Sequence, residues 1–522
     1  MRALLMFRDR DLVLPHEPVQ RARYWDPDIP HRELAPHERA LLQDLEVETL
    51  LRVMGGGDEF LHGVAREALL GGRAVDAETI LYRQEVLRDC LEHPGVVEQL
   101  YALVVETLET RRQGHLGVLS RYPAGVLHGS VTLMGVLVEM LLRLRRIAEE
   151  NTGSFRSEGF STLFTMLQRE IGDDYLAEIQ QHLAALRHDN GILLSASLGP
   201  GNQGTGYVLR EHRPAQRSWL GRLLGRRGPG FTFFIADRDE AGARALGALR
   251  DQGINLVANA LAQSTEHITK LFAQLRAELG FYLGCLRLHR RLAALGVPLC
   301  FPRPQAAGSR RLSFSDLCDP SLALTLGRRG VGNTTDATGK SLLVITGANQ
   351  GGKSSHLRAI GLAQLMMQAG MFVAAGSFEG ELETGLLTHF QREEDAAMKS
   401  GKLDEELARM SALVDVAAPE SIVLLNESFS STNECEASEI ARQVVRALIE
   451  RRIKVVFVTH LFEFARLLRE EARADTMFLR AERLPDGTRT FRIVEGEPLQ
   501  TSYGEDLYRE VFGAEPSPPA AG

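Results

Sequence analysis

Residues 347–354 constrain the fold of this chain more than any other part of its sequence. They read Gly-Ala-Asn-Gln-Gly-Gly-Lys-Ser, match G-x-x-x-x-G-K-[ST], and stand between an apolar run at 341–346 and a helical pattern at 356–368. In this pattern the glycines let backbone N–H groups surround phosphate, and the helix N-terminus adds its dipole. The sequence therefore predicts a strand, a phosphate-binding loop and a helix. The residues expected to hold phosphate and magnesium are Gly347, Gly351, Gly352, Lys353 and Ser354.

Each of these polar residues has an expected role. We expect Lys353 to reach the terminal phosphates and the Ser354 hydroxyl to bind Mg²⁺. Downstream, the apolar run 421–425 ends in Asn426 and Glu427. Asn426 stands where an aspartate is usual. Its amide oxygen can accept a hydrogen bond from a magnesium-bound water, but asparagine brings one negative charge fewer to the site than aspartate would. Glu427 is then the carboxylate placed to activate the attacking water.

A third polar pair follows the apolar run 455–458, where Thr459 and His460 end the predicted strand. The carboxyl ends of parallel strands lie at one edge of a sheet. We therefore expect His460 to act as a sensor of the γ-phosphate and to join Glu427 as a catalytic residue.

The pattern of apolar residues divides the chain into regions. Residues 38–150 show helical spacing, and a stripe from Leu261 to Leu286 predicts a lever helix of about 38 residues. Beyond residue 311, short apolar runs alternate with helical stretches, which indicates a parallel sheet flanked by helices. The expected divisions are an irregular N-terminal arm at 1–37, a helical core and lever domain at 38–300, a linker and domain start at 301–330, an α/β domain at 331–512 and a disordered tail at 513–522.

A basic, glycine-rich segment at 199–230 interrupts the helical region and is expected to be a long loop or a hairpin. Its arginines either form a solvated face or contact a phosphate backbone, since each contact releases a counterion. The candidates for DNA contact are Arg213, Arg217, Arg222, Arg226 and Arg227.

Composition sets limits on the function. The chain has 44% hydrophobic and 25% charged residues, as in ordinary globular proteins. Because the net charge is −8, nucleic-acid binding would depend on a local basic patch. Five cysteines without C-x-x-C spacing favour reduced thiols and a cytoplasmic protein. We expect neither export nor a membrane span, since charge interrupts every long apolar run.

These motifs together resemble the ATPase domain of the MutS family of DNA mismatch-repair proteins. Residues 346–355 look like that family's T-G-P-N-M-G-G-K-S-T, and residues 426–432 resemble D-E-x-x-x-G-T. The resemblance is strong over 340–512 and weaker at 44–48 and 82–89. Three further segments are similar to motifs of the family: 370–375 resembles G-x-[FY]-V-P-A, 459–463 resembles T-H-x-x-E and 502–504 resembles S-Y-G.

The resemblance implies an α/β P-loop NTPase fold of the ABC and MutS-like type, with a parallel, mixed sheet, preceded by a mostly α-helical lever and core domain. It implies ATP and Mg²⁺ as cofactors and ATP hydrolysis as the activity. It also implies mismatched or branched DNA as the partner of a homodimer that acts as a clamp in mismatch repair or recombination. Other proteins of a repair pathway are further implied partners. The resemblance adds Asn349 and Ser355 to the nucleotide contacts. In the family a serine contacts the nucleotide of the opposite subunit. Gly401 aligns with that serine, so Ser400 and Lys402 are the candidates for this contact.

The resemblance also has limits. Only about 40 residues precede the helical region and a short tail follows residue 504, so we expect a reduced form without the N-terminal recognition domain and without the Smr nuclease. An alternative is a nucleotide-gated scaffold in which Asn426 suppresses hydrolysis and DNA is not bound. A generic ABC or SMC ATPase would carry L-S-G-G-Q before residue 421, and the sequence has none.

Overall fold

The computed structural model describes residues 1–15, 32–71, 76–114, 123–186, 193–210, 234–236, 238–392 and 401–498. The chain forms two compact units, each built from separate stretches of sequence. The first comprises Met1–Ala3, Gly95–Phe155 and Phe160–Arg276, and the second comprises Leu4–Pro94, Arg156–Gly159 and Ala277–Gly522. The helical domain expected at 38–300 is therefore divided between the two, because its first and last parts pack with the α/β region.

The first unit is mainly helical. Its core includes the rings of Phe155 and Phe160, whose centroids lie 4.4 Å apart. Among the described residues, α6 is the one helix long and apolar enough to cross a membrane, and 44% of its most apolar stretch is buried within the protein, a property it shares with core helices. The elements that lie mostly in this unit are α5 (Pro94–Gly114), α6 (Pro123–Asn151), α7 (Glu158–Glu170), α8 (Asp173–Leu186), β1 (Leu193–Leu198), the 3-10 turn η2 (Pro200–Asn202), β2 (Gly204–Arg210) and most of α10 (Glu240–Ala294).

Strands β1 and β2 form an antiparallel hairpin in which Leu193 pairs with Arg210. The basic segment expected at 199–230 thus begins with the turn η2 and the strand β2, and its five candidate arginines lie outside the described residues. Helix α10 has 55 residues, against the 38 or so expected. Its N-terminal half is rich in alanine and leucine, which offset the cost of Gly247 and Gly253, about 1 kcal/mol each within a helix.

The second unit begins with residues 4–12, which lie against α10. The backbone N–H groups of Leu5 and Leu12 donate to the Glu278 carboxylate at 2.6 and 2.7 Å. The irregular arm expected at 1–37 ends slightly early, because Pro36 starts a helix whose N-terminus Glu38 caps. The helices of this part are α1 (Pro36–Asp44), α2 (Val47–Gly55), α3 (Glu59–Leu70) and α4 (Ala77–Glu92).

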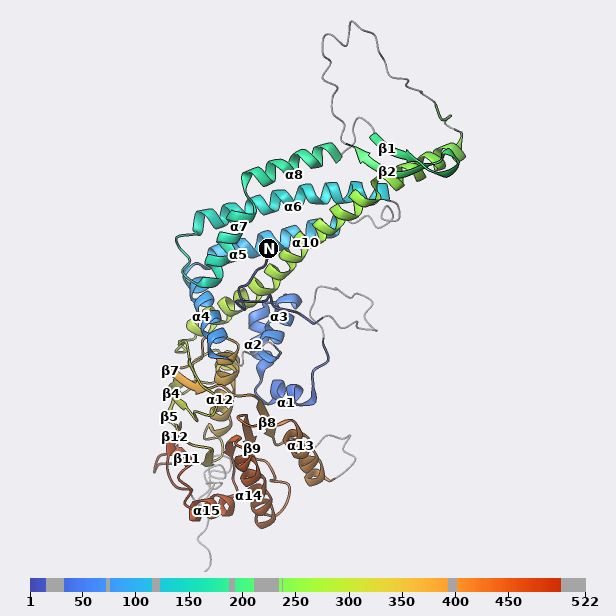
Figure 1. Ribbon diagram of the computed structural model, residues 1–522. Coiled ribbons are helices and arrows are strands. Elements are labelled where there is room, and N and C mark those ends of the chain that lie inside the picture. Colours follow the sequence, from blue (N-terminus) through green and yellow to red (C-terminus); the bar gives the residue numbers. More distant parts are fainter. Residues whose placement is uncertain are drawn as a thin grey trace, which may run out of the picture. The chain divides into compact units, whose positions relative to one another are not determined.

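A six-stranded mixed sheet forms the centre of the α/β region, coloured from yellow to red in Figure 1. Its strand order is β12-β11-β6-β10-β9-β8, and every neighbouring pair is parallel except β11 and β12. This arrangement agrees with the expected mixed sheet. The strands are β6 (Leu342–Gly347), β8 (Leu386–Phe390), β9 (Ile422–Asn426), β10 (Lys454–Val458), β11 (Thr476–Arg483) and β12 (Arg489–Glu495).

Helices cover both faces of this sheet, because consecutive residues of its central strands are apolar, as in 342–345, 422–425 and 455–458. Val423 and Leu425 share one buried cluster with residues of α13, α14 and α15. The residue between them, Leu424, faces the other side, where Gly361 of α12 approaches it closely. The flanking helices are α12 (Lys353–Gln368), α13 (Lys402–Val416), α14 (Glu434–Glu450) and α15 (Phe462–Glu470).

A second sheet of four strands, in the order β3-β7-β4-β5, corrects the sequence interpretation of 301–311 as a linker. Residues of that segment form β3, which pairs in parallel with β7. Pro304 fits there because β3 is an edge strand, where a missing N–H costs no ladder bond. A partner more than 70 residues away leaves no local signal. The elements are β3 (Arg303–Gln305), β4 (Leu312–Leu317), α11 (Pro320–Leu326), β5 (Asn333–Asp336) and β7 (Ser377–Glu381).

Within the second unit, α12 is tied to the N-terminal helices at both of its ends. Near its start, Arg358 donates to Asp319 at 2.6 Å and also pairs with Glu46, which precedes α2. At its end, the buried Arg83 of α4 donates to the carbonyl oxygen of Ala369 at 3.3 Å. These contacts involve the two N-terminal segments, 44–48 and 82–89, that carry the weaker resemblance.

Candidate nucleotide-binding site

Close contacts or a left-handed backbone favour glycine at three positions of the loop between β6 and α12. Gly347 has φ 110°, and a Cβ atom there would lie 2.9 Å from the backbone nitrogen of Ala481 on β11. A Cβ at Gly351 would lie 2.7 Å from the Cβ of Ala481. Gly352 has φ 90°, and the non-glycine Gln350 has φ 56°. The loop is thus a tight, left-handed turn pressed against the neighbouring strand, which side chains at these positions would open.

Lys353 is the first residue of α12 and its side chain lies inside this loop. It is 5% exposed, and its Nζ atom donates to the carbonyl oxygens of Gly347 and Ala348, both at 2.9 Å. Burial lowers the pKa of Lys353 to about 8, Glu427 opposes this change, and the positive charge of Arg489 adds to it. The loop therefore holds a buried cation that is paired with neutral oxygen atoms and not with a carboxylate.

Ser354 and Asn426 meet at the start of α12 and the end of β9. The Ser354 hydroxyl donates to Oδ1 of Asn426 at 3.1 Å. Both side chains offer an oxygen atom, the kind of ligand that Mg²⁺ prefers. Mg²⁺ usually keeps several waters beside one or two protein ligands. No group of three or more histidine, cysteine, aspartate or glutamate side chains suited to a metal occurs among the described residues. The pair therefore fits a magnesium ion held together with phosphate better than a cation bound by protein alone.

Glu427 follows Asn426 and lies against His460, which follows β10. Nε2 of His460 and Oε1 of Glu427 are 3.0 Å apart, and each side chain is 32% exposed. The hydrogen bond from His460 holds the pKa of Glu427 below its usual range, and the charge of Lys353 helps, while burial opposes both. Glu427 also has φ 54°, a left-handed conformation uncommon for a non-glycine residue. The strained backbone presents an ionised carboxylate beside the loop.

The parallel register explains why these groups meet. Val458 of β10 pairs with Ile345 of β6 on one side and with Asn426 of β9 on the other. The carboxyl ends of the three central strands therefore lie at one edge of the sheet, as expected. The structure brings Lys353, Ser354, Asn426, Glu427 and His460 to this edge, and their chemical roles stay predictions.

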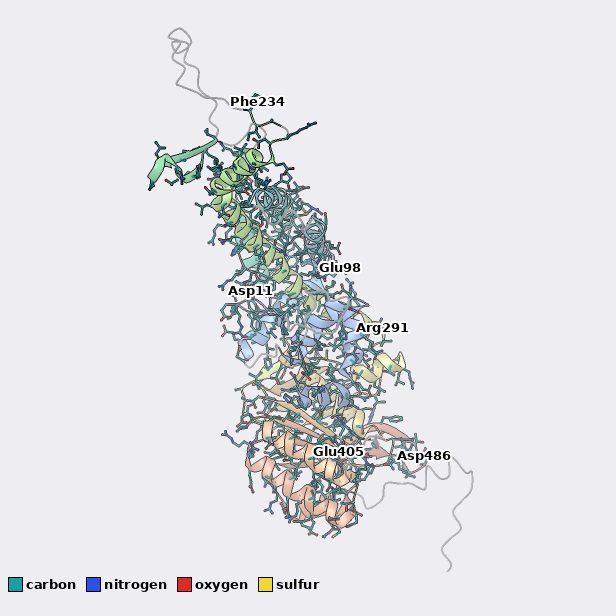
Figure 2. All side chains as sticks on the ribbon, turned by 90° about the vertical axis from the view of Figure 1, so that its right-hand side faces the viewer. Asp11, Glu98, Phe234, Arg291, Glu405 and Asp486 are labelled. Atoms are coloured by element: carbon teal, nitrogen blue, oxygen red, sulfur yellow. The ribbon has the colours of Figure 1, made fainter. Side chains whose placement is uncertain are left out.

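A buried glutamate from α13 supports the segment that follows Glu427, and the sequence interpretation missed it. Oε1 of Glu406 accepts the N–H of Phe429 at 3.0 Å, and Oε2 accepts the Ser431 hydroxyl at 2.8 Å. His389 of β8 lies 2.7 Å from the Ser428 hydroxyl. Glu406 follows Glu405, which Figure 2 labels near the start of α13. Its signal was weak, because one acidic residue on a charged helix resembles any solvated face.

The hairpin of β11 and β12 forms another wall of the site that the sequence did not reveal. Its turn carries Asp486, labelled in Figure 2. Nη1 of Arg489 donates to Oε1 of Gln350 in the loop at 2.9 Å. Phe491 is 48% exposed and has φ 58°. Phe491 and His356 line a largely apolar cavity of about 260 Å³ that borders Gly352 and Ser355. The hairpin thus places an arginine and an aromatic ring beside the loop.

Several expected site residues are not joined to this cluster. Asn349 is exposed on the loop, and Ser355 lines the cavity. Lys402 begins α13, and Gly401 is the N-cap of that helix. The trans-contact candidate Ser400 and the DNA-contact candidates Arg213, Arg217, Arg222, Arg226 and Arg227 lie outside the described residues, as does the 502–504 motif.

The fold and the site define a protein that joins a largely helical region to an α/β domain with a glycine-rich loop between a parallel strand and a helix. Two family models match it: the MutS2 N-terminal domain over residues 75–295 and MutS domain V over residues 343–511. Together the two models match most of the chain to MutS-type domains, in agreement with the resemblance found in the sequence.

Curated relatives resemble one part of the chain. The DNA mismatch repair protein MutS of Chloroflexus aurantiacus is 30% identical over 187 residues, which are 35% of this chain and 19% of that protein. The DNA mismatch repair protein MutS of Thermus thermophilus is 31% identical over 166 residues, which are 32% of this chain and 20% of that protein. The chain thus spans about a fifth of the length of these relatives.

Proposed function

We propose that this chain binds ATP with Mg²⁺ at the loop of residues 347–354 and hydrolyses it, and that it couples this reaction to DNA. The observation that carries the proposal is the convergence of Lys353, the Ser354–Asn426 pair and the Glu427–His460 pair at one edge of the sheet. A cation, a pair of oxygen ligands and an ionised carboxylate are what phosphoryl transfer to water requires.

The triphosphate would lie in the turn from Gly347 to Gly352, where backbone N–H groups and the N-terminus of α12 favour anions. Lys353 would exchange its bonds to the Gly347 and Ala348 carbonyl oxygens for bonds to phosphate oxygens. Phosphate oxygens carry negative charge and carbonyl oxygens do not, so phosphate is the better partner for the ammonium group. The apolar cavity beside Phe491 would receive the base, since its 260 Å³ is small for a whole ligand but suits one flat ring.

Magnesium would be held by the Ser354 hydroxyl together with phosphate oxygens and water, with Asn426 accepting a hydrogen bond from one of those waters. The ion neutralises charge that develops on the phosphates. Asn426 orients the Ser354 hydroxyl but adds no negative charge of its own. We therefore expect weaker magnesium binding than an aspartate at this position would give.

Glu427 would orient the attacking water and take up its proton. Its low pKa leaves the carboxylate ionised at neutral pH, and the strained backbone with φ 54° holds it at the sheet edge. The 3.0 Å bond from His460 fixes one carboxylate oxygen, which leaves the other for water. General base catalysis of this kind contributes about 10²–10⁴-fold to a rate.

The wider setting of this activity is also part of the proposal. The named relatives are DNA mismatch repair proteins, so we propose mismatched or branched DNA as the partner, a homodimer that closes on it, and a place among the proteins of a repair or recombination pathway in the cytoplasm. Basic residues of 213–227 are the proposed DNA contacts, and Ser400 or Lys402 would reach the nucleotide of the second subunit.

The test is steady-state ATP hydrolysis by the purified chain, without DNA and with single-stranded, homoduplex, mismatched or four-way-junction DNA. We expect magnesium-dependent turnover that a mismatch or a junction stimulates. The variant Lys353→Ala should lose ATP binding, and full affinity in that variant would refute the proposed loop. Lys340→Ala serves as the control, since that lysine is partly exposed and bonds the Ala474 carbonyl oxygen, away from the loop.

A second function is supported by Asn426. If the missing negative charge suppresses turnover, ATP would hold a complex together without being consumed, and the chain would be a nucleotide-gated scaffold. Tight ATP binding without measurable hydrolysis, with or without DNA, would favour this alternative over the ATPase.

A further inference from the structure

We propose that Arg489 of β12 is a second phosphate-binding residue of this site, whose guanidinium joins Lys353 on the polyphosphate of the bound nucleotide. The inference rests on the proposed function, since it adds a residue to the same loop. It depends on three observations: where the β11–β12 hairpin lies, which partners Arg489 has, and how charge is balanced around the loop.

The hairpin touches the loop along its length. Ala481 of β11 stands so close to Gly347 and Gly351 that no side chain fits between them. At the other end of the loop, a Cβ on Gly352 would lie 3.4 Å from the carbonyl oxygen of Phe491. Arg489 lies two residues before Phe491 on β12, and its Nη1 atom is 2.9 Å from the Gln350 side chain in the loop. Its guanidinium is therefore at the loop and not at the outer edge of the hairpin.

The partners of Arg489 leave its binding capacity incomplete. A guanidinium has five N–H donors and is always charged. The bond to Gln350 is made to a neutral amide oxygen, and Nε of Arg489 is buried without a hydrogen-bond partner. Among the described residues, no aspartate or glutamate forms an ion pair with it. Other arginines beside the sheet, such as Arg358 and Arg442, bind carboxylates.

The charge balance of the loop points in the same direction. Lys353 and Arg489 are close enough to repel each other, and the one carboxylate that acts on Lys353 is Glu427, which already pairs with His460. Lys353 and Arg489 are thus two cations beside one carboxylate that is already paired, which is an unfavourable arrangement in a partly buried site. A polyphosphate would neutralise both, and the planar fork of arginine matches phosphate oxygens better than lysine does.

The test is calorimetric binding of two probes, ATP and inorganic tripolyphosphate, to the full chain in magnesium buffer. Tripolyphosphate carries the phosphates without the base or the sugar. The variant is Arg489→Met, which keeps the length of the side chain but removes the charge. Arg489→Lys retains the charge, and Arg492→Met is the matched control, an exposed arginine on the same strand.

We expect Arg489→Met to lower the affinity for ATP and for tripolyphosphate by the same factor, about tenfold to hundredfold. This is the effect expected when a hydrogen bond to a charged group is lost. Arg489→Lys should recover part of this loss for both probes, and Arg492→Met should bind like the native chain. The slope of log affinity against log salt should also fall in Arg489→Met, because one cation fewer meets the phosphates.

Two outcomes would overturn the inference. Native affinity of Arg489→Met for both probes would mean that the guanidinium does not reach phosphate. A loss confined to ATP would mean that Arg489 acts through Phe491 and the base cavity. Failure of the native chain to bind either probe would instead refute the proposed function, so the two failures are distinguishable.

Discussion

The Ser354 hydroxyl donates a hydrogen bond of 3.1 Å to the amide oxygen of Asn426. This contact joins the first turn of α12 to the end of β9, the two elements between which we propose that magnesium binds. An amide oxygen can orient the hydroxyl as an aspartate would, but it carries no charge. In the proposed magnesium site the pair would therefore offer oxygen atoms to the ion with less attraction than an aspartate would give.

The substitution Asn426→Asp restores that charge. We expect the Mg²⁺ concentration for half-maximal ATP hydrolysis to fall about tenfold, since changes beside a metal ligand alter affinity by roughly 10–100-fold. The measurement is a magnesium titration of turnover. Asn259→Asp, an equal change on the exposed face of α10, is the control. An unchanged magnesium requirement in Asn426→Asp would contradict the assignment of this position.

The substitution Glu427→Gln separates binding from chemistry. Glutamine keeps the size and can still pair with His460, but it cannot take a proton from water. We expect ATP affinity to stay within about threefold and turnover to fall at least about 100-fold. Equilibrium binding measures the ATP affinity, and phosphate release measures the turnover. Glu470→Gln, at the exposed end of α15, should behave as the native chain. Native turnover in Glu427→Gln would exclude it as the base.

The substitution Arg83→Met tests the link between α4 and the end of α12. Arg83 is fully buried and donates to the carbonyl oxygens of Met6 and Ala369. Without it both oxygens lose a charged donor, so we expect the free energy of unfolding to fall by about 3 kcal/mol. Arg88→Met, on the exposed side of the same helix, should cost less than about 1 kcal/mol. Urea denaturation measures both, and equal losses would refute the link.

The buried carboxyl of Glu278 should make the stability of the fold depend on pH. Burial raises the pKa of this carboxyl to about 7, with a smaller contribution from Asp11, while the N–H groups of Leu12, Leu5 and Met6 oppose the rise. A carboxyl whose pKa is higher in the folded state stabilises the fold below its unfolded pKa. That stability is lost as pH rises through the folded value.

We therefore expect the free energy of unfolding to fall by on the order of 3 kcal/mol between pH 4.5 and 7, beyond the effect of other groups. Glu278→Gln cannot ionise, so the difference between the native chain and this variant isolates the contribution. The measurement is denaturant unfolding at a series of pH values. Parallel pH profiles of the two proteins would show that Glu278 does not titrate in this range.

Much of the α/β region could be predicted because its signals are local. The apolar runs before Gly347, Asn426 and Thr459 became β6, β9 and β10. Parallel strands bring their carboxyl ends together, so the meeting of Lys353, Asn426 and Glu427 followed from chain order alone.

The missed features depend on partners far away in the chain. Residues 303–305 appeared to be a linker, since a short edge strand with a proline has no pattern of its own and exists because β7 pairs with it. Glu406 and Arg489 resembled solvent-exposed charges. Their roles appear when α13 packs beside β8 and the β11–β12 hairpin folds against the loop.

The sequence by itself determined the phosphate-binding motif, the alternation of strands and helices, and the resemblance to the MutS family, because these depend on residue spacing within short stretches of chain. The tertiary structure decided which charges meet. It buried Lys353 among carbonyl oxygens, paired Glu427 with His460 and set Arg489 against Gln350. The physical reason is that burial and charge pairing act through space, and the Arg489–Gln350 contact of this site joins residues 139 positions apart in the chain.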